Sequence, residues 1–141
     1  LDADLEAVAR WRDAAGEASL VFHRAIDATS DPVAVLGQLA GAGVDRILTS
    51  GGAARSVDGV STLARLVDAA GDVEIMAGGG IRPADIPAIL ASGVHAVHLS
   101  ARGQAGLDEP SGPGGGDAGY DVTDPAVVAE ARAAVHGVPR V

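Results

Sequence analysis

Four short apolar runs recur along the chain at nearly constant spacing, and this regularity restricts the folds open to it. The runs centre near residues 22, 47, 75 and 97, so successive centres lie 25, 28 and 22 residues apart. Between them, apolar residues recur at helical spacing, as in Val35, Leu36 and Leu39. Short strands alternating with helices are typical of parallel βα units. We therefore expect an α/β fold with parallel strands at 19–23, 46–49, 73–77 and 96–99.

Helix start and stop signals fill the intervals between these runs. Ser30 and Asp31 precede a proline, as does Asp124, and both arrangements are typical of a helix start. Pro87 falls inside the fourth predicted helix and should weaken or bend its first turns. Glycines then mark the helix ends. The predicted helices are 2–15, 32 to 41 or 43, 56–71, 83–93 and 125–137.

An internal sequence repeat indicates how many βα units a complete fold would need. Residues 43–50 resemble residues 93–100, an offset of 50 residues that equals two βα units. Eight such units make a (β/α)8 TIM barrel of about 250 residues, whereas this chain has 141 residues and four predicted strands. We therefore expect a partial TIM-barrel domain over 1–137 and a tail at 138–141. The stretch 103–119 holds seven glycines and two prolines, so it is expected to be a flexible acidic insert.

Composition argues against several classes of partner. The formal net charge is −9, and all ten basic residues are arginine. Because there is no basic stripe, we expect no binding of nucleic acid and none of a membrane. The chain has no cysteine, which removes disulfides, thiolate metal sites and cysteine nucleophiles. No secretory signal is visible at Leu1, so a cytoplasmic location is expected.

Candidate ligand-binding residues follow the predicted strands, because parallel α/β folds bind ligands at the carboxyl ends of their strands. Three arginines are expected to converge on that rim. Glycine runs there let backbone N–H groups approach an anion, although a tight structural turn explains them equally well. The residues predict a small-anion site, for phosphate or carboxylate, formed by Arg24, Ser50, Gly51, Gly78, Gly79, Gly80, Arg82, His98, Ser100 and Arg102.

His23 and Asp27 are the candidates for acid–base chemistry. An imidazole titrates near neutrality, and Asp27, four residues later, could orient it or bind a ligand hydroxyl. The structural alternative is that Asp27 pairs with Arg24, or that His23 packs inside the fold. His95 and His98 are three residues apart on a strand and therefore face opposite sides. No metal site is predicted.

Four stretches together resemble one family. They are 21–27 (VFHRAID), 44–51 (VDRILTSG), 75–82 (IMAGGGIR) and 97–102 (VHLSAR). Their residues, order and spacing are similar to those of the CutC family, called copper homeostasis proteins, with coverage from about residue 1 to 137. The resemblance implies a cytoplasmic TIM barrel that is often a homo-oligomer, of which this chain matches the second half. Copper is implied only by this resemblance, and the cofactor is otherwise unknown.

Three functional interpretations remain open at this point. The first is a CutC-like copper homeostasis protein with a small-anion site at the carboxyl ends of its strands. The second is a barrel enzyme of isomerase or lyase type acting on a phosphorylated small molecule. The third is an inactive, truncated fragment, whose open sheet would need another surface to cover it.

Overall fold

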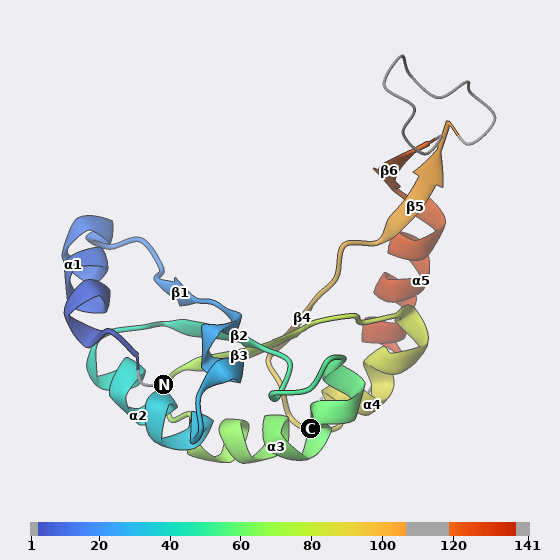
Figure 1. The fold of residues 1–141 in the computed structure, drawn as a ribbon. Helices are drawn as coiled ribbons and strands as arrows, with labels where there is room; N and C mark the ends of the chain where they lie inside the picture. Colours follow the sequence, from blue (N-terminus) through green and yellow to red (C-terminus); the bar gives the residue numbers. More distant parts are fainter. Residues whose placement is uncertain (1–2, 107–118, 138–141) are drawn as a thin grey trace.

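The computed structural model describes residues 3–106 and 119–137 (Figure 1). A four-stranded sheet alternates with helices, and a two-stranded sheet follows it. In chain order the elements are α1 (Leu5–Ala15), β1 (Val21–Phe22), η1 (Arg24–Ala28), α2 (Pro32–Gly41), β2 (Arg46–Thr49), η2 (Ser56–Gly59), α3 (Val60–Ala69), β3 (Glu74–Gly78), η3 (Pro83–Asp85), α4 (Ile86–Leu90), β4 (Ala96–His98), β5 (Arg102–Ala105), β6 (Tyr120–Thr123) and α5 (Pro125–His136), where η denotes a 3-10 helix.

The four predicted parallel strands are confirmed, and they lie side by side in the order β1-β2-β3-β4. The strand order advances in one direction, and right-handed crossovers in such an order place their helices on one face of the sheet. Figure 1 shows the result, a curved sheet whose convex side carries α2, α3 and α4, with α1 and α5 at the two ends. This sequential winding is that of a barrel, and it differs from the reversed order of a doubly wound fold.

Strand β1 is shorter than the predicted 19–23. The Leu20 N–H donates to the Asp45 carboxylate at 2.7 Å, while the Leu20 carbonyl accepts from the backbone N–H groups of Asp45 and Arg46. The Asp45 side chain thus accepts the Leu20 N–H that would otherwise have extended the β1–β2 ladder. Arg12 of α1 also donates to Asp45, so this corner ties α1 to the start of β2.

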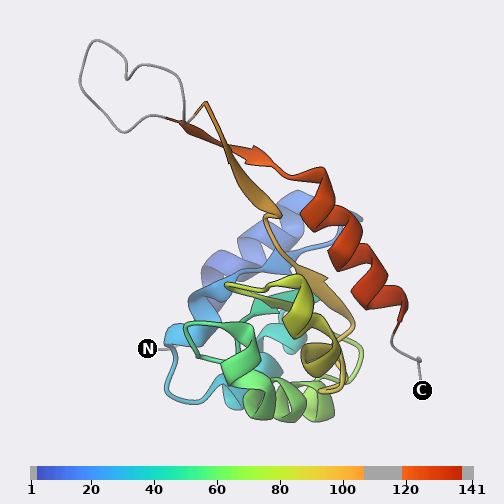
Figure 2. The same cartoon turned by 90° about the vertical axis from the view of Figure 1, so that its right-hand side faces the viewer.

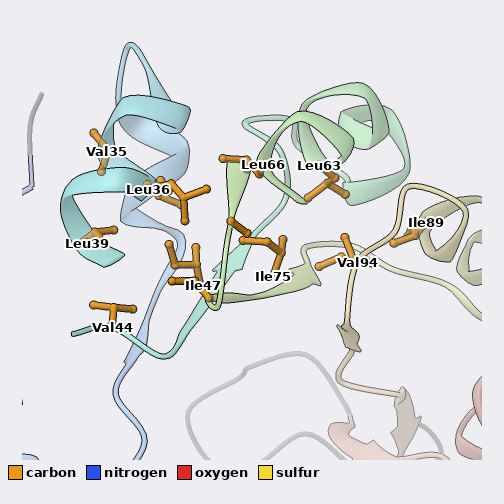
Figure 3. Close-up of a cluster of buried hydrophobic side chains, with 14 of the residues drawn as sticks. Val35, Leu36, Leu39, Val44, Ile47, Leu63, Leu66, Ile75, Ile89 and Val94 are labelled. Carbon is orange, nitrogen blue, oxygen red and sulfur yellow. The ribbon is translucent and has the colours of Figure 1, made fainter. Parts of the chain in front are cut away.

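The hydrophobic core fills the layer between the sheet and its helices (Figure 3). Alternate residues of β2 and β3 face the helices, and Ile47 and Ile75 are fully buried there. They pack in the core with Leu36, Leu39, Leu63 and Leu66. Leu48 and Met76 face the concave side and are only half-buried. Within the described residues, β1 and β4 are edge strands, so the concave face belongs to an open sheet.

The structure differs from the predicted insert at the N-terminal end of that insert. Residues 102–105 and 120–123 form the antiparallel pair β5–β6, so residues 103–105 are a strand rather than a loop. This hairpin stands away from the four-stranded sheet in both views (Figures 1 and 2). Residues 107–118 and the predicted tail at 138–141 lie outside the described residues.

Two predicted helices begin with a 3-10 turn. The third consists of η2 followed by α3, and the fourth of η3 followed by α4. Pro87 stands in the first turn of α4, where its missing N–H costs little, and the preceding turn takes the 3-10 form. In the described part of the chain, no helix has both the length and the apolar character that crossing a membrane requires.

Candidate functional site

The loops that follow β1, β2 and β3 meet at one end of the sheet. Arg24, in η1, donates from Nη2 to the Ser50 hydroxyl, 2.9 Å away in the loop after β2. That loop continues to Ser56, whose backbone N–H donates to the Gly79 carbonyl at 2.9 Å. Hydrogen bonds therefore bring together predicted site residues from three loops.

Asp27 accepts hydrogen bonds on both carboxylate oxygens, and its side chain is only 11% exposed. Oδ1 accepts from the Thr49 hydroxyl at 2.5 Å and from the Gly52 N–H at 3.1 Å. Oδ2 accepts from Arg24 Nε at 2.8 Å and lies 2.9 Å from the Ser50 hydroxyl. The Ser50 N–H lies 3.1 and 3.2 Å from the two oxygens. Burial raises the pKa of Asp27, but the hydrogen bonds from Thr49, Arg24 and Ser50 outweigh it and leave the pKa below its ordinary value.

The backbone N–H groups of the 49–52 loop, predicted to face a ligand, form hydrogen bonds within the protein instead. The N–H groups of Ser50 and Gly52 point to Asp27, and that of Gly51 donates to the Thr49 hydroxyl at 2.9 Å. Ser50 and Gly51 were expected to contact a ligand, whereas in this structure their backbone donors surround a carboxylate of the chain itself.

Arg24 retains donors that nothing in the described chain uses. A guanidinium has five N–H groups, and Arg24 commits one on Nε to Asp27 and one on Nη2 to Ser50. The side chain is 43% exposed. A Cβ at Gly79 would lie 3.0 Å from Arg24 Nη1 and 3.1 Å from the Ser50 Cβ, and φ of Gly79 is +142°. The guanidinium is therefore held close to the 78–80 glycine run, with three N–H groups left for a ligand.

Arg55 holds the other side of the glycine run and was not predicted. Its Nη2 donates to the Asp85 carboxylate at 2.5 Å and its Nε to the Gly80 carbonyl at 3.4 Å. Arg55 lies six residues beyond β2, whereas the predicted site residues follow the strands more closely. Arg82 is exposed, and its backbone N–H donates to Asp85 at 3.1 Å.

His23 is not paired with Asp27. Its Nδ1 accepts the Ala25 N–H at 3.2 Å and caps η1, so the neutral ring carries its proton on Nε2. The ring lies edge-on to Phe22, with centroids 5.5 Å apart, beside an apolar groove of about 110 Å³ that Trp11 also lines. The structural alternative for Asp27, pairing with Arg24, is the one that the geometry shows.

The remaining predicted residues lie around β4 and β5. His98 pairs in register with Gly78, where a Cβ would lie 2.5 Å from the Leu48 side chain, so Gly78 has a packing role. Ser100 follows β4 and is exposed. Arg102 lies on β5 and pairs with Asp121 of β6 at 2.6 Å. Arg102 therefore forms an ion pair inside the hairpin, and its convergence with Arg24 stays a prediction.

His95, just before β4, and His98, its last residue, have different surroundings. His95 accepts the Ile75 N–H on Nδ1 at 2.9 Å, which ties the start of β4 to β3. His98 is exposed at the other end of the strand. Across residues 3–106 and 119–137, no three His, Cys, Asp or Glu side chains gather in a way that could hold a metal ion.

Comparison with known proteins gives a consistent result over the first three quarters of the chain. The model of the CutC family matches residues 1–103, a shorter span than the 1–137 that the resemblance suggested. A family protein CutC of Xanthomonas campestris pv. campestris (strain B100) is 43% identical over 102 residues, which cover 71% of this chain and 42% of the relative. One from Salmonella schwarzengrund (strain CVM19633) is 42% identical over 100 residues, covering 71% and 40%.

A solved structure agrees in fold. CutC from Streptococcus agalactiae, provisionally described as a copper homeostasis protein, superposes with a TM-score of 0.64 at 31% identity. The match covers 69% of this chain and 49% of that one. The chain thus spans less than half the length of each of these relatives.

Proposed function

The chain belongs to the CutC family, and from that premise we propose that the loops after β1 and β3 bind a small anion, a phosphate or a carboxylate. The observation that carries the proposal is the state of Arg24, a fixed guanidinium with three uncommitted N–H groups beside the glycine run. A fixed guanidinium fork matches the oxygens of phosphate and carboxylate, and little entropy is lost when it binds them.

The local charge favours an anion although the whole chain is acidic. Arg24 is balanced by Asp27, and Arg55 by Asp85. Arg82 adds a further positive charge on the exposed rim of the same glycine run. Gly80 is exposed and has no side chain, so an anion can approach the backbone there closely. These features support a site of net positive charge in a chain whose net charge is −9.

Calorimetric titration with inorganic phosphate and, separately, acetate tests the proposal and distinguishes the two ligands. Replacing Arg24 by alanine should weaken binding of the preferred anion by at least about tenfold, as expected for the loss of a charge-assisted hydrogen-bond pair. Arg65 of α3 is exposed, so Arg65→Ala is a control with the same change in charge. Equal affinities in wild type and Arg24→Ala would refute the site.

A role in copper homeostasis extends to this chain as a proposal, through its family alone. Copper(I) prefers cysteine and methionine sulfur, but the sequence has no cysteine, and Met76 is its single methionine. The described residues therefore do not fit a sulfur-rich copper site. We expect the 141-residue chain to lose copper(I) to a competing chelator, and retention of one equivalent would show a site that these residues do not explain.

A further inference from the structure

The backbone of the 49–52 loop is shaped around a carboxylate. Gly51 and Gly52 have φ of +72° and +76°, the left-handed region that side chains avoid. A Cβ on Gly51 would lie 2.4 Å from the Gly59 carbonyl oxygen, so this loop conformation requires glycine there. In this conformation the Ser50 and Gly52 N–H groups and the Thr49 hydroxyl point to the same carboxylate.

We propose that the 49–52 loop is a carboxylate-binding cradle whose resident ligand is the side chain of Asp27. The cradle supplies the N–H groups of Ser50 and Gly52 and the Thr49 hydroxyl, while the single proton of the Ser50 hydroxyl is shared between Asp27 and the Ala53 carbonyl, 2.6 Å away. Because a carboxylate has about four lone-pair positions, these donors and Arg24 leave Asp27 without capacity for a substrate. Asp27, predicted as a catalytic residue, is instead a positioning residue.

The group that Asp27 positions is Arg24. Arg24 Nε donates a hydrogen bond to Oδ2 of Asp27, and Arg24 Nη2 donates one to the hydroxyl of Ser50, which is part of the cradle. Two neighbouring nitrogens of one planar group are thus fixed, which sets the direction of Nη1 near Gly79. This part of the inference rests on the proposed anion site, whereas the cradle itself does not.

Chemical rescue tests the cradle without reference to the anion site. In Asp27→Ala the cradle loses its ligand, and sodium formate should fill it. At tenfold excess over Kd, binding should raise the Tm of the variant by about 3 to 5 °C more than it raises the Tm of wild type, against sodium chloride at equal ionic strength. Asp27→Asn is the matched control, because its amide still occupies the cradle, and it should show no extra rise. An equal shift in all three proteins would overturn the cradle.

The phosphate affinity of Asp27→Asn tests the positioning of Arg24. The amide oxygen is expected at the Oδ1 position, where Thr49 and Gly52 donate, so the amide NH2 faces Arg24 and displaces it. Removing a negative charge would by itself strengthen phosphate binding, so a loss of affinity reports lost position. We expect a loss of at least about fivefold, on the scale of one neutral hydrogen bond. An unchanged or tighter affinity would overturn the positioning role.

The two experiments separate the two proposals. If wild type does not bind phosphate or acetate but formate rescues Asp27→Ala, the proposed function fails and the cradle stands. If wild type binds phosphate and formate rescues nothing, the cradle fails and the anion site stands. If Asp27→Ala does not fold, Asp27→Asn, which keeps the size of the side chain, still decides the positioning role. Asp58→Ala controls for charge, because Asp58 is exposed on η2.

Discussion

Replacing Asp27 with asparagine should destabilise the fold by about 3 kcal/mol at pH 7, because the amide cannot satisfy the donors that the carboxylate satisfies. Whichever way the amide turns, its NH2 faces at least two donors: Arg24 Nε and the Ser50 N–H on one side, or the Thr49 hydroxyl and the Gly52 N–H on the other. Two lost hydrogen bonds to a charged group cost about 1.5 kcal/mol each. The Arg24 side chain is 43% exposed, so solvent screening places its share at the lower end.

The stability difference between wild type and Asp27→Asn should depend on pH, and the pKa of Asp27 sets the direction of that dependence. The folded protein lowers the pKa of Asp27 from its ordinary value of 3.8, because the hydrogen bonds from Thr49, Arg24 and Ser50 outweigh the opposing effect of burial. A carboxylate with a lowered pKa stabilises the fold above its unfolded-state pKa, and this stabilisation is lost as pH falls through the folded-state pKa. The stability difference between wild type and Asp27→Asn should therefore be full at pH 7 and should shrink below 3.8.

Urea unfolding, followed by far-ultraviolet circular dichroism at pH 7 and again near pH 3, measures both effects. Asp58→Asn serves as the control, because Asp58 is an exposed carboxylate on η2 and its replacement should change stability by less than about 0.5 kcal/mol. A cost for Asp27→Asn below about 1 kcal/mol at pH 7 would refute the hydrogen-bond account. A cost that persists undiminished near pH 3 would refute the linkage to the ionised carboxylate.

Four further substitutions test the packing and the helix capping, all by urea unfolding. Gly51→Ala should lower the free energy of unfolding by more than about 2 kcal/mol, since its Cβ would lie 2.4 Å from the Gly59 carbonyl oxygen. The comparison variant Gly37→Ala, in α2 with open space around it, should instead raise the free energy of unfolding by about 0.5 to 1 kcal/mol. Asp31→Ala should cost about 1 kcal/mol, because Asp31 caps two N–H groups of α2. Leu36→Ala should cost about 2 to 5 kcal/mol, since Leu36 is fully buried. A Gly51→Ala variant as stable as Gly37→Ala, or an Asp31 or Leu36 variant as stable as wild type, would contradict the corresponding contact.

Much of the fold follows from patterns that are local in the sequence. Three of the four predicted strands lie within one residue of the observed ones, because alternating burial along β2 and β3 requires apolar residues at fixed positions. Helix α2 begins where Asp31 and Pro32 predict, since a cap acts on N–H groups two and three residues away. The β5–β6 hairpin was missed, because residues 102–105 carry no strand pattern and the strand depends on pairing with β6.

The candidate site also combines features that follow from local sequence with features that depend on tertiary packing. The sequence by itself placed Arg24, Asp27, Ser50 and the 78–80 run at the carboxyl ends of the strands, because strand direction and loop position follow from local pattern. Only the tertiary structure decided their roles. Asp27 contacts donors 22 to 25 residues along the chain, and Arg55 reaches Asp85 across 30. The geometry of such contacts depends on how the loops pack against one another. The sequence therefore predicts Asp27 as a catalytic residue, whereas in the structure its carboxylate is hydrogen-bonded to Arg24.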